Sequence, residues 1–310
     1  MNTPLLFNYE LRPSKFVERR MFIMSLSRVI AHFGGDYQYV GFGGLSFTDF
    51  KLFHKELNID KMVSIEAGDD IMLERLEFNK PYSCILIQKG LSTEQLTQVD
   101  FSKKSIVWLD YDESLQEYYF DDISYVLSKM VVGSVIAISC NTKLLKKKDQ
   151  PYTNEEFLDI FGIHIPADIG ENCCLGANSA TTLMRMFRQS CESTINERNL
   201  AQDDKLRFRS LFFFTYRDGT PMMTYGGIVL PEQFDNSELN FDGLNFIGED
   251  KYDIDVPLLT MKEAIKLNQV LNDSDREESE IIALKILDRE GIDKYKALYK
   301  YMPNYFDVRL

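Results

Sequence analysis

A glycine-rich turn between a short apolar run and a helical pattern constrains the fold of this chain more than any other stretch. The run Tyr37–Val40 leads into Gly41–Gly44, and a helical pattern extends over residues 48–56. Glycine lacks a Cβ, so the backbone can turn sharply and lie close to a ligand. The free N–H groups at the start of the helix then face that ligand. Strand, glycine turn and helix in this order predict the opening βαβ unit of a nucleotide-binding fold, although a plain tight turn can carry the same glycines.

A single acidic residue follows the next apolar run at an informative distance. The run Lys61–Glu66 is rich in apolar and β-branched residues and ends in a carboxylate. Glu66 lies about 20 residues beyond Gly44, the spacing at which an acid at the tip of a second strand meets a pair of ribose hydroxyls. An acid that merely follows a strand is the alternative. The helix after Ala67 can begin at Asp69 or Asp70, since either can cap it.

Three further apolar runs alternate with helical patterns. They cover residues 81–88, 105–112 and 133–139. Runs without polar alternation are typical of strands covered on both faces, as in a parallel sheet. Five rounds of strand and helix therefore predict an α/β fold with a doubly wound, mostly parallel sheet and right-handed crossovers.

The fourth of the five predicted strands, residues 105–112, ends in two acidic residues on either side of a tyrosine: Asp110, Tyr111 and Asp112. Ligands of open α/β sheets bind beyond the carboxyl ends of the strands. This stretch is therefore the second place where chemistry is expected.

The last strong pattern in the first part of the chain is a hairpin. Two aromatic and β-branched runs over residues 207–216 and 222–230 flank Asp218-Gly219, a preferred turn dipeptide. These strands could extend the sheet as an antiparallel edge or bridge to a partner. We expect a domain of residues 1–230, followed by an acidic linker and helical tail of residues 231–310 that either caps the domain or docks a neighbour.

Charge and cysteine usage limit the function classes. The net charge is −13 and the pI is about 4.8, which argues against wide nucleic-acid contact by bulk attraction. Two groups of basic residues could still form a local track for nucleic acid: those of the predicted first helix and the run Lys143–Lys148. The basic residues of the predicted first helix form either a solvated helix face or a cationic patch near the ligand mouth. They are Arg12, Lys15, Arg19 and Arg20.

The five cysteines include no Cys-x-x-Cys pair, and two of them lie inside apolar runs. They are expected to be buried free thiols in a reducing cytosol. Because the three histidines are scattered, no metal site is expected. No apolar run reaches membrane-spanning length, so we expect a cytoplasmic protein without membrane contact.

The order of these landmarks resembles class I S-adenosylmethionine-dependent methyltransferases, whose sheet is Rossmann-like. The glycine turn resembles their first motif, and Glu66 resembles the acid that binds the cofactor ribose. Trp108–Asp112 resembles their fourth motif, and the hairpin resembles their last, antiparallel strand pair. Three phrases, Tyr39–Gly44, Asp49–His54 and Trp108–Asp112, also resemble poorly characterised bacterial proteins described as O-methyltransferases.

The resemblance implies S-adenosylmethionine as cofactor and O-methyl transfer as reaction, because the fourth motif lacks the Asp-Pro-Pro-Tyr of enzymes that methylate base amino groups. The catalytic residue would be Asp110 or Asp112, which would act as a general base or would orient the nucleophile. The residues implied in cofactor binding are Gly41, Phe42, Gly43, Gly44, Glu66, Ala67 and Tyr111.

The chain also departs from this pattern. Tyr39 stands where the first motif usually has an acid, and Gln88–Gly90 stands where an acid near the adenine is often found. An alternative is therefore a catalytically degenerate, methyltransferase-like subunit. It would act as a nucleotide sensor or as a scaffold in a larger assembly, such as a phage-defence complex, with a protein partner or a second copy bound through the tail. A third reading, an NAD-linked enzyme, is disfavoured by the Asp-Tyr-Asp stretch and the terminal hairpin.

Overall fold

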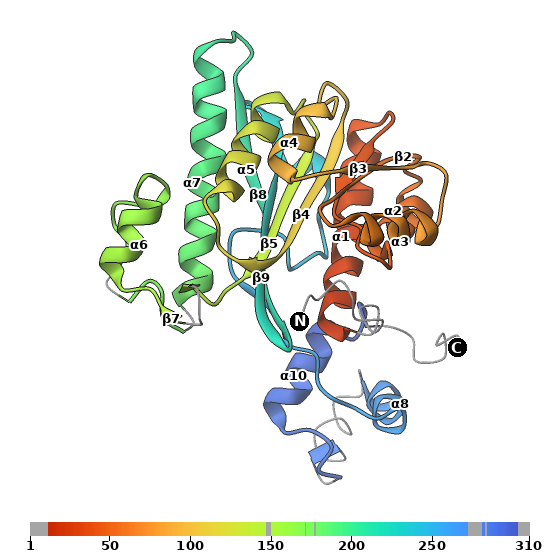
Figure 1. Ribbon diagram of the computed structural model, residues 1–310. Helices are drawn as coiled ribbons and strands as arrows, with labels where there is room; N and C mark the ends of the chain where they lie inside the picture. Colours follow the sequence, from red (N-terminus) through yellow and green to blue (C-terminus); the bar gives the residue numbers. More distant parts are fainter. Residues whose placement is uncertain are drawn as a thin grey trace.

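The computed structural model describes residues 12–146, 150–170, 172–176, 178–271, 281–282 and 284–302. Its centre is an eight-stranded sheet in the order β10-β8-β9-β5-β4-β1-β2-β3, with helices on both faces (Figure 1). The strands of this sheet are β1 (Gln38–Gly41), β2 (Lys61–Glu66), β3 (Ile85–Lys89), β4 (Ser105–Ser114), β5 (Val135–Asn141), β8 (Leu206–Asp218), β9 (Thr220–Pro231) and β10 (Tyr252–Ile254). A separate two-stranded sheet joins β6 (Leu145–Lys146) to β7 (Gln150–Pro151).

The α-helices follow the strands in the alternation expected for a doubly wound sheet. They are α1 (Pro13–Phe33), α2 (Thr48–Leu57), α3 (Asp70–Asn79), α4 (Ser92–Gln95), α5 (Tyr118–Lys129), α6 (Asn154–Phe161), α7 (Asn178–Leu200), α8 (Met261–Val270) and α10 (Arg289–Leu298). Local sequence explains several of their ends. Pro13 occupies the first turn of α1, and the Asp69 side chain accepts a hydrogen bond from Met72 N at the start of α3.

The strand directions confirm the predicted fold class. Strands β1 to β5 pair in parallel, and β9 runs antiparallel to both β5 and β8. The predicted hairpin, β8 and β9, extends the parallel sheet as an antiparallel segment, as expected, and only the short strand β10 lies beyond it. Strand β9 lies inside the sheet, where Tyr225 pairs with Ile138 on one side and with Phe213 on the other, and β10 lies outside β8. The residues from Met223 to Leu230 are buried, as a central strand requires.

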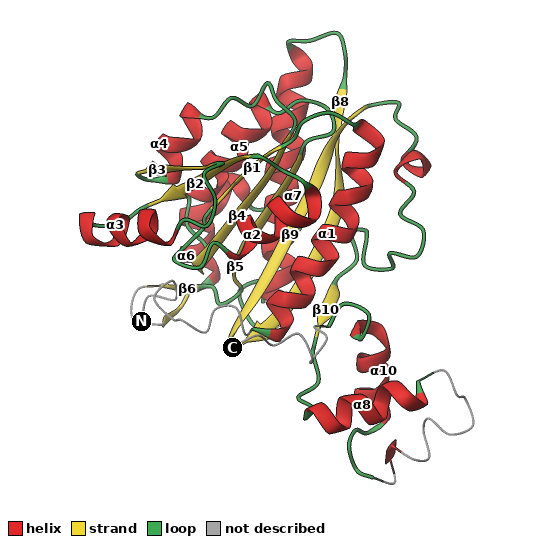
Figure 2. Ribbon diagram, turned by 90° about the vertical axis from the view of Figure 1, so that its right-hand side faces the viewer, coloured by secondary structure: helices red, strands yellow, loops and turns green. Residues whose placement is uncertain are grey.

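Helices cover both faces of the sheet (Figure 2), and an apolar core lies on each face. One contains α1, α2 and α3 and is rich in aromatic rings: the centroid of Phe22 lies 4.5 Å from Trp108 and 4.6 Å from Phe212. The other packs α5 and α7 against β4, β5 and β9 through residues such as Phe120 and Phe187. Because the central strands are covered on both faces, their apolar residues point to both sides of the sheet.

The chain beyond residue 230 first adds strand β10 to the main sheet and then continues into helices outside the sheet. Strand β10 pairs in parallel with β8, and the ring of Phe246 lies 5.6 Å from that of Tyr301 in the first of these cores. Helices α8 and α10 pack on each other through a small core of their own, at one end of the molecule (Figure 1). The division at residue 230 stays a prediction. Within the described ranges no helix combines the length and the apolar character needed to cross a bilayer.

Candidate cofactor pocket

A cavity of about 540 Å³ opens at the carboxyl ends of β1, β2 and β4 and continues between α2 and α3. This volume falls in the range of small-molecule and cofactor sites. Its lining includes every residue that the sequence singled out for cofactor binding or catalysis except Gly41. The lining residues are Phe42, Gly43, Gly44, Leu45, Ser46, Thr48, Asp49, Lys51, Glu66, Ala67, Met72, Arg75, Asn79, Pro81, Asp110, Tyr111, Asp112, Glu113, Tyr118 and Tyr119.

The glycine turn is shaped by close packing. A Cβ on Gly43 would lie 2.6 Å from both the Ser64 hydroxyl and the ring of Phe47, and Gly44 has a φ of +53°. Gly41 serves another purpose than lining the cavity, because a Cβ there would meet the hydroxyl of Tyr39 at 2.6 Å. The glycines therefore let the backbone pass close to the neighbouring strands and leave its amides at the cavity wall.

Glu66 is joined to this turn by hydrogen bonds. Its Oε1 accepts from Gly43 N at 2.7 Å, from Gly44 N at 3.2 Å and from the Ser64 hydroxyl at 2.5 Å. Burial raises the pKa of Glu66, and these three bonds oppose the rise. All three fall on Oε1, which leaves Oε2 as the carboxylate atom for a ligand that donates hydrogen bonds.

Asp110 is held at the cavity wall by a buried lysine of α1. Lys15 Nζ, on the first turns of α1, lies 2.9 Å from Asp110 Oδ1 and 2.9 Å from Glu18 Oε2, and it donates to the Tyr216 hydroxyl at 3.0 Å. It also lies 4.3 Å from the ring centroid of Trp108. Lys15 is only 2% exposed. The cation therefore neutralises Asp110 and fixes its position at the cavity wall.

The prediction of a solvated basic face on this helix was wrong for two of its residues. Lys15 and Arg19 are both buried, and Arg19 pairs with Asp49, which lines the cavity. Arg20 fits the prediction, since it pairs with Glu56 on the half-exposed surface. The buried cations do lie near the ligand mouth, but each is paired with a carboxylate.

A chain of buried polar groups continues inward from Lys15. Glu18 accepts a hydrogen bond from the Thr224 hydroxyl, the Thr224 and Ser139 hydroxyls lie 2.6 Å apart, and Trp108 Nε1 donates to the Ser139 oxygen at 2.8 Å. Burial raises the pKa of Glu18, while the charge of Lys15 opposes the rise. These residues come from α1, β4, β5 and β9, so the network connects the first helix to strand β9.

The turn of the hairpin fixes the start of the same helix. Asp218 accepts hydrogen bonds from Ser14 N at 3.2 Å and from Lys15 N at 2.9 Å. A carboxylate from β8 thus satisfies free N–H groups at the helix N-terminus, where Arg12 offers no side-chain cap. Sequence reasoning missed this contact because the two segments are 203 residues apart.

Aromatic rings form one wall of the cavity. Tyr111 stacks on Tyr119 with ring centroids 3.7 Å apart, and Phe42 lies 5.3 Å from Tyr111. The Tyr111 hydroxyl donates to Asp122 Oδ2 at 2.6 Å, and burial together with this carboxylate holds the pKa of Tyr111 well above its usual range. Tyr111 therefore presents its ring, and not its hydroxyl, to a ligand.

The rim of the cavity is charged and open. Asp112 and Glu113 are exposed on the β4 side, and Lys51 and Arg75 line the part between α2 and α3. Sequence reasoning did not single out Met72, Arg75 and Asn79. Their spacing of three and four residues places them along one stripe of α3.

Outside the cavity, one group of side chains among the described residues could hold a metal. No metal site was expected because the three histidines are scattered along the sequence, yet His54 lies beside Asp60 and Cys84. All five cysteines are free, and four are buried as predicted, but Cys84 is partly exposed. The other two histidines have protein neighbours: His32 lies near Glu238, and His164 stacks on Phe120.

Comparison with known proteins gives one match in sequence. Residues 7–310 match a family model described as "Putative O-methyltransferase". No curated protein matches the chain.

Several solved structures are similar in fold. An O-methyltransferase from Bacillus cereus in complex with SAH is 13% identical, with 66% of this chain and 79% of that chain covered and a TM-score of 0.36. A cofactor-bound protein from MTB is 12% identical, with coverages of 69% and 81% and a TM-score of 0.37. The LepI complex with SAM is 10% identical, with coverages of 66% and 46% and a TM-score of 0.35.

Proposed function

Because the chain belongs to the family described as "Putative O-methyltransferase", we propose that it is an S-adenosylmethionine-dependent enzyme that methylates a hydroxyl oxygen. One observation supports the proposal independently of the family match. The amides of Gly43 and Gly44, the carboxylate of Glu66 and that of Asp110 all border a single cavity at the carboxyl edge of the sheet. This is the edge at which open α/β folds bind their ligands.

The residues at the cavity suit an adenosyl cofactor. Oε2 of Glu66 can accept hydrogen bonds from vicinal ribose hydroxyls. Gly43 and Gly44 let the amino-acid end approach the backbone, with Phe42 and Ala67 beside them. The ring of Tyr111 offers a flat apolar wall, backed by its stack on Tyr119. When bound, the cofactor supplies a methyl group on a sulfonium, which a nucleophile can attack in line.

With the cofactor bound, the acceptor oxygen would take the methyl group as the carbon–sulfur bond breaks, and the hydroxyl proton would pass to a carboxylate at the cavity, Asp110 or Asp112. Asp110 is paired with Lys15, so its role is to orient the acceptor hydroxyl and to favour loss of its proton. Asp112, exposed at the rim, is placed to pass a proton to solvent.

The first experiment is calorimetric titration of the protein with S-adenosylhomocysteine. Glu66→Gln removes the charge but keeps the shape, and it should weaken binding by about tenfold or more, since a hydrogen bond to a charged group contributes about 1.5–3 kcal/mol. Glu74→Gln, an exposed change on α3 outside the cavity lining, is the matched control. Equal affinity for both variants would reject the role given to Glu66.

Catalysis is tested separately from binding. Asp110→Asn should lower turnover with a panel of phenols, catechols and sugar alcohols while the affinity for S-adenosylhomocysteine stays within about threefold, because the substitution keeps the shape and acts on the acceptor side. Undiminished turnover would reject Asp110 as the orienting group.

A second candidate is an assembly subunit with little or no turnover. It is supported by exposed apolar side chains on the segment after residue 230, including Leu258, Met261 and Ile265. Light scattering and a thermal-shift series with S-adenosylmethionine and nucleotides distinguish the two. A stable oligomer without a shift from S-adenosylmethionine would favour the subunit. The free, mostly buried thiols support a cytoplasmic location for either function.

A further inference from the structure

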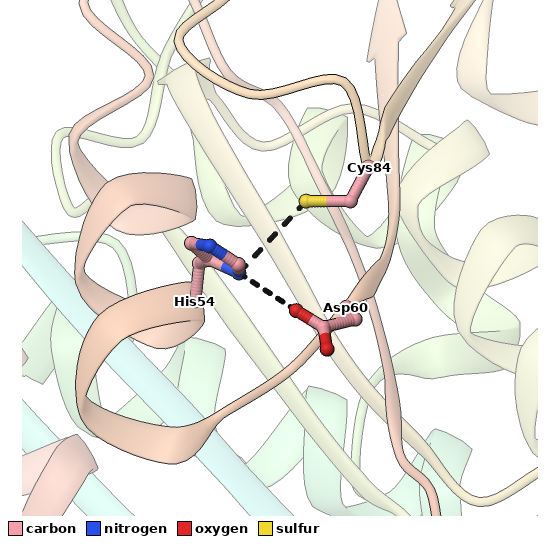
Figure 3. A group of neighbouring side chains, drawn as sticks. All are labelled: His54, Asp60 and Cys84. Atoms are coloured by element: carbon pink, nitrogen blue, oxygen red, sulfur yellow. Dashed lines mark hydrogen bonds and ion pairs between the residues drawn. The ribbon is translucent and has the colours of Figure 1, made fainter.

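Three side chains of metal-binding type meet at the edge of the sheet opposite the carboxyl ends of the strands. His54 lies in the last turns of α2, Asp60 directly precedes β2, and Cys84 directly precedes β3. Figure 3 shows the three side chains pointing toward one another. His54 Nδ1 lies 3.1 Å from Asp60 Oδ1 and 3.8 Å from Cys84 Sγ, and the three ligand atoms all lie within 4.8 Å of one another.

Hydrogen bonding alone explains this arrangement poorly. His54 Nδ1 also lies 3.1 Å from the carbonyl oxygen of Ile59. One ring nitrogen therefore faces a carboxylate, a carbonyl and a sulfur, and a single N–H proton can be directed at only one of them. A cation between these atoms would instead be attracted to all of them.

The distances suit tetrahedral coordination. Zinc lies about 2.0–2.1 Å from imidazole nitrogen, about 2.0–2.2 Å from carboxylate oxygen and about 2.3 Å from thiolate sulfur. Tetrahedral angles then place neighbouring N and O ligands roughly 3.3 Å apart, and N and S ligands roughly 3.6 Å apart. The separations from His54 Nδ1, 3.1 Å to Asp60 and 3.8 Å to Cys84, deviate from these values by only a few tenths of an ångström.

The backbone holds the three ligands in place. Ile59 is buried, and Asn58 ends α2 in the left-handed region with a φ of 54°, which directs the chain from His54 to Asp60. Met62 N donates to the Cys84 carbonyl at 3.2 Å, so the starts of β2 and β3 are joined beside the ligands. The ring of Tyr82 lies 4.4 Å from that of His54 and limits its rotation.

We propose that His54, Asp60 and Cys84 bind one divalent transition-metal ion of the zinc class, with water at the fourth position. The mixed nitrogen, oxygen and sulfur donors suit zinc, cobalt or nickel and do not suit magnesium or calcium, which take oxygen ligands. His54 and Cys84 are partly exposed and Asp60 is exposed, which leaves the ion a path to the site. None of the three lines the cofactor cavity, so the ion acts by clipping α2 to the sheet, and this proposal does not depend on methyl transfer.

The test uses the full-length protein, stripped of metal with a chelator under reducing conditions, then titrated with Co²⁺ and Zn²⁺ separately. We expect one equivalent of Co²⁺ with a thiolate-to-cobalt charge-transfer band in the near ultraviolet, displaced by Zn²⁺. Cys84→Ser should abolish the band, and His54→Gln and Asp60→Asn should each weaken Zn²⁺ binding by about tenfold or more. Zn²⁺ should also raise the melting temperature of the wild type but not that of these variants.

The control addresses the other thiols that could bind the ion. Cys173 and Cys174 are neighbours with sulfur atoms 3.6 Å apart. Their double substitution by serine should leave both the band and the zinc affinity unchanged. A band that survives Cys84→Ser and disappears in the double variant would overturn the proposal, as would a wild type that binds no equivalent of either ion. Asp60→Asn is exposed and isosteric, so it keeps the test valid even if Cys84→Ser folds poorly.

Discussion

Replacing Lys15 by methionine should destabilise the protein far more than the loss of a surface charge would. Lys15 contacts Asp110 and Glu18 at 2.9 Å each, and the side chain of Glu18 is fully buried. Methionine keeps the apolar length of the side chain but removes the cation that lies 2.9 Å from both carboxylates. Breaking a buried ion pair from one side costs about 3–5 kcal/mol, so we expect a loss of that size in the free energy of unfolding.

The assay is urea unfolding at pH 7, followed by the fluorescence of Trp108. This is the only tryptophan of the chain, and its ring lies 4.3 Å from Lys15 Nζ. The matched control is Arg20→Met on the same helix, whose partner Glu56 is 45% exposed. Exposed pairs contribute about 0–1 kcal/mol, so the control should change the free energy of unfolding by less than about 1 kcal/mol.

A double substitution separates the pair from its surroundings. In the Lys15→Met, Asp110→Asn variant the charge that Lys15 attracted is gone as well, so part of the stability should return, with a coupling of about 1–3 kcal/mol. If Lys15→Met is no more destabilising than Arg20→Met, or if the two substitutions at the pair are additive, the reasoning about a buried, mutually dependent pair is refuted.

Three further outcomes follow from the same structure. Gly43→Ala should weaken S-adenosylhomocysteine binding by about tenfold or more, because the added methyl must displace a strand residue and a buried ring; Gly162→Ala, which meets open space, should leave calorimetric binding unchanged. Asp218→Ala removes the cap of α1 and should lower the free energy of unfolding in urea by about 1–2 kcal/mol; an unchanged value would mean that water caps the helix equally well. Because burial raises the folded-state pKa of Glu18 above 4.5, its contribution to stability is fully present below that pH and is lost as the pH rises through the raised value. Glu18→Gln should therefore gain stability relative to the wild type as the pH rises from 4.5 to 7, by up to about 1.4 kcal/mol per pH unit, and a relative loss over this window in urea titrations would show that the pKa is lowered instead.

The sequence determined the order of elements and the edge at which the cavity forms. Apolar runs that alternate with helical patterns can be buried only as a two-sided, mostly parallel sheet, and parallel strands end at a common edge. For that reason Gly43, Glu66 and Asp110, taken from the ends of three different runs, lie around one cavity. Tyr111 was placed there by the same argument.

The tertiary structure decided everything that depends on contacts between distant segments. Lys15 and Arg19 look like part of a solvated stripe, because helical periodicity does not reveal which charges find a buried partner. Their burial required Asp110, Asp49 and the hairpin, which lies 203 residues from the start of α1. In the same way, His54 meets a carboxylate and a thiol only because α2 ends where two neighbouring strands begin. A sequence pattern reports the burial of a face, whereas the pairing of individual charges and ligands is fixed only when the chain is packed.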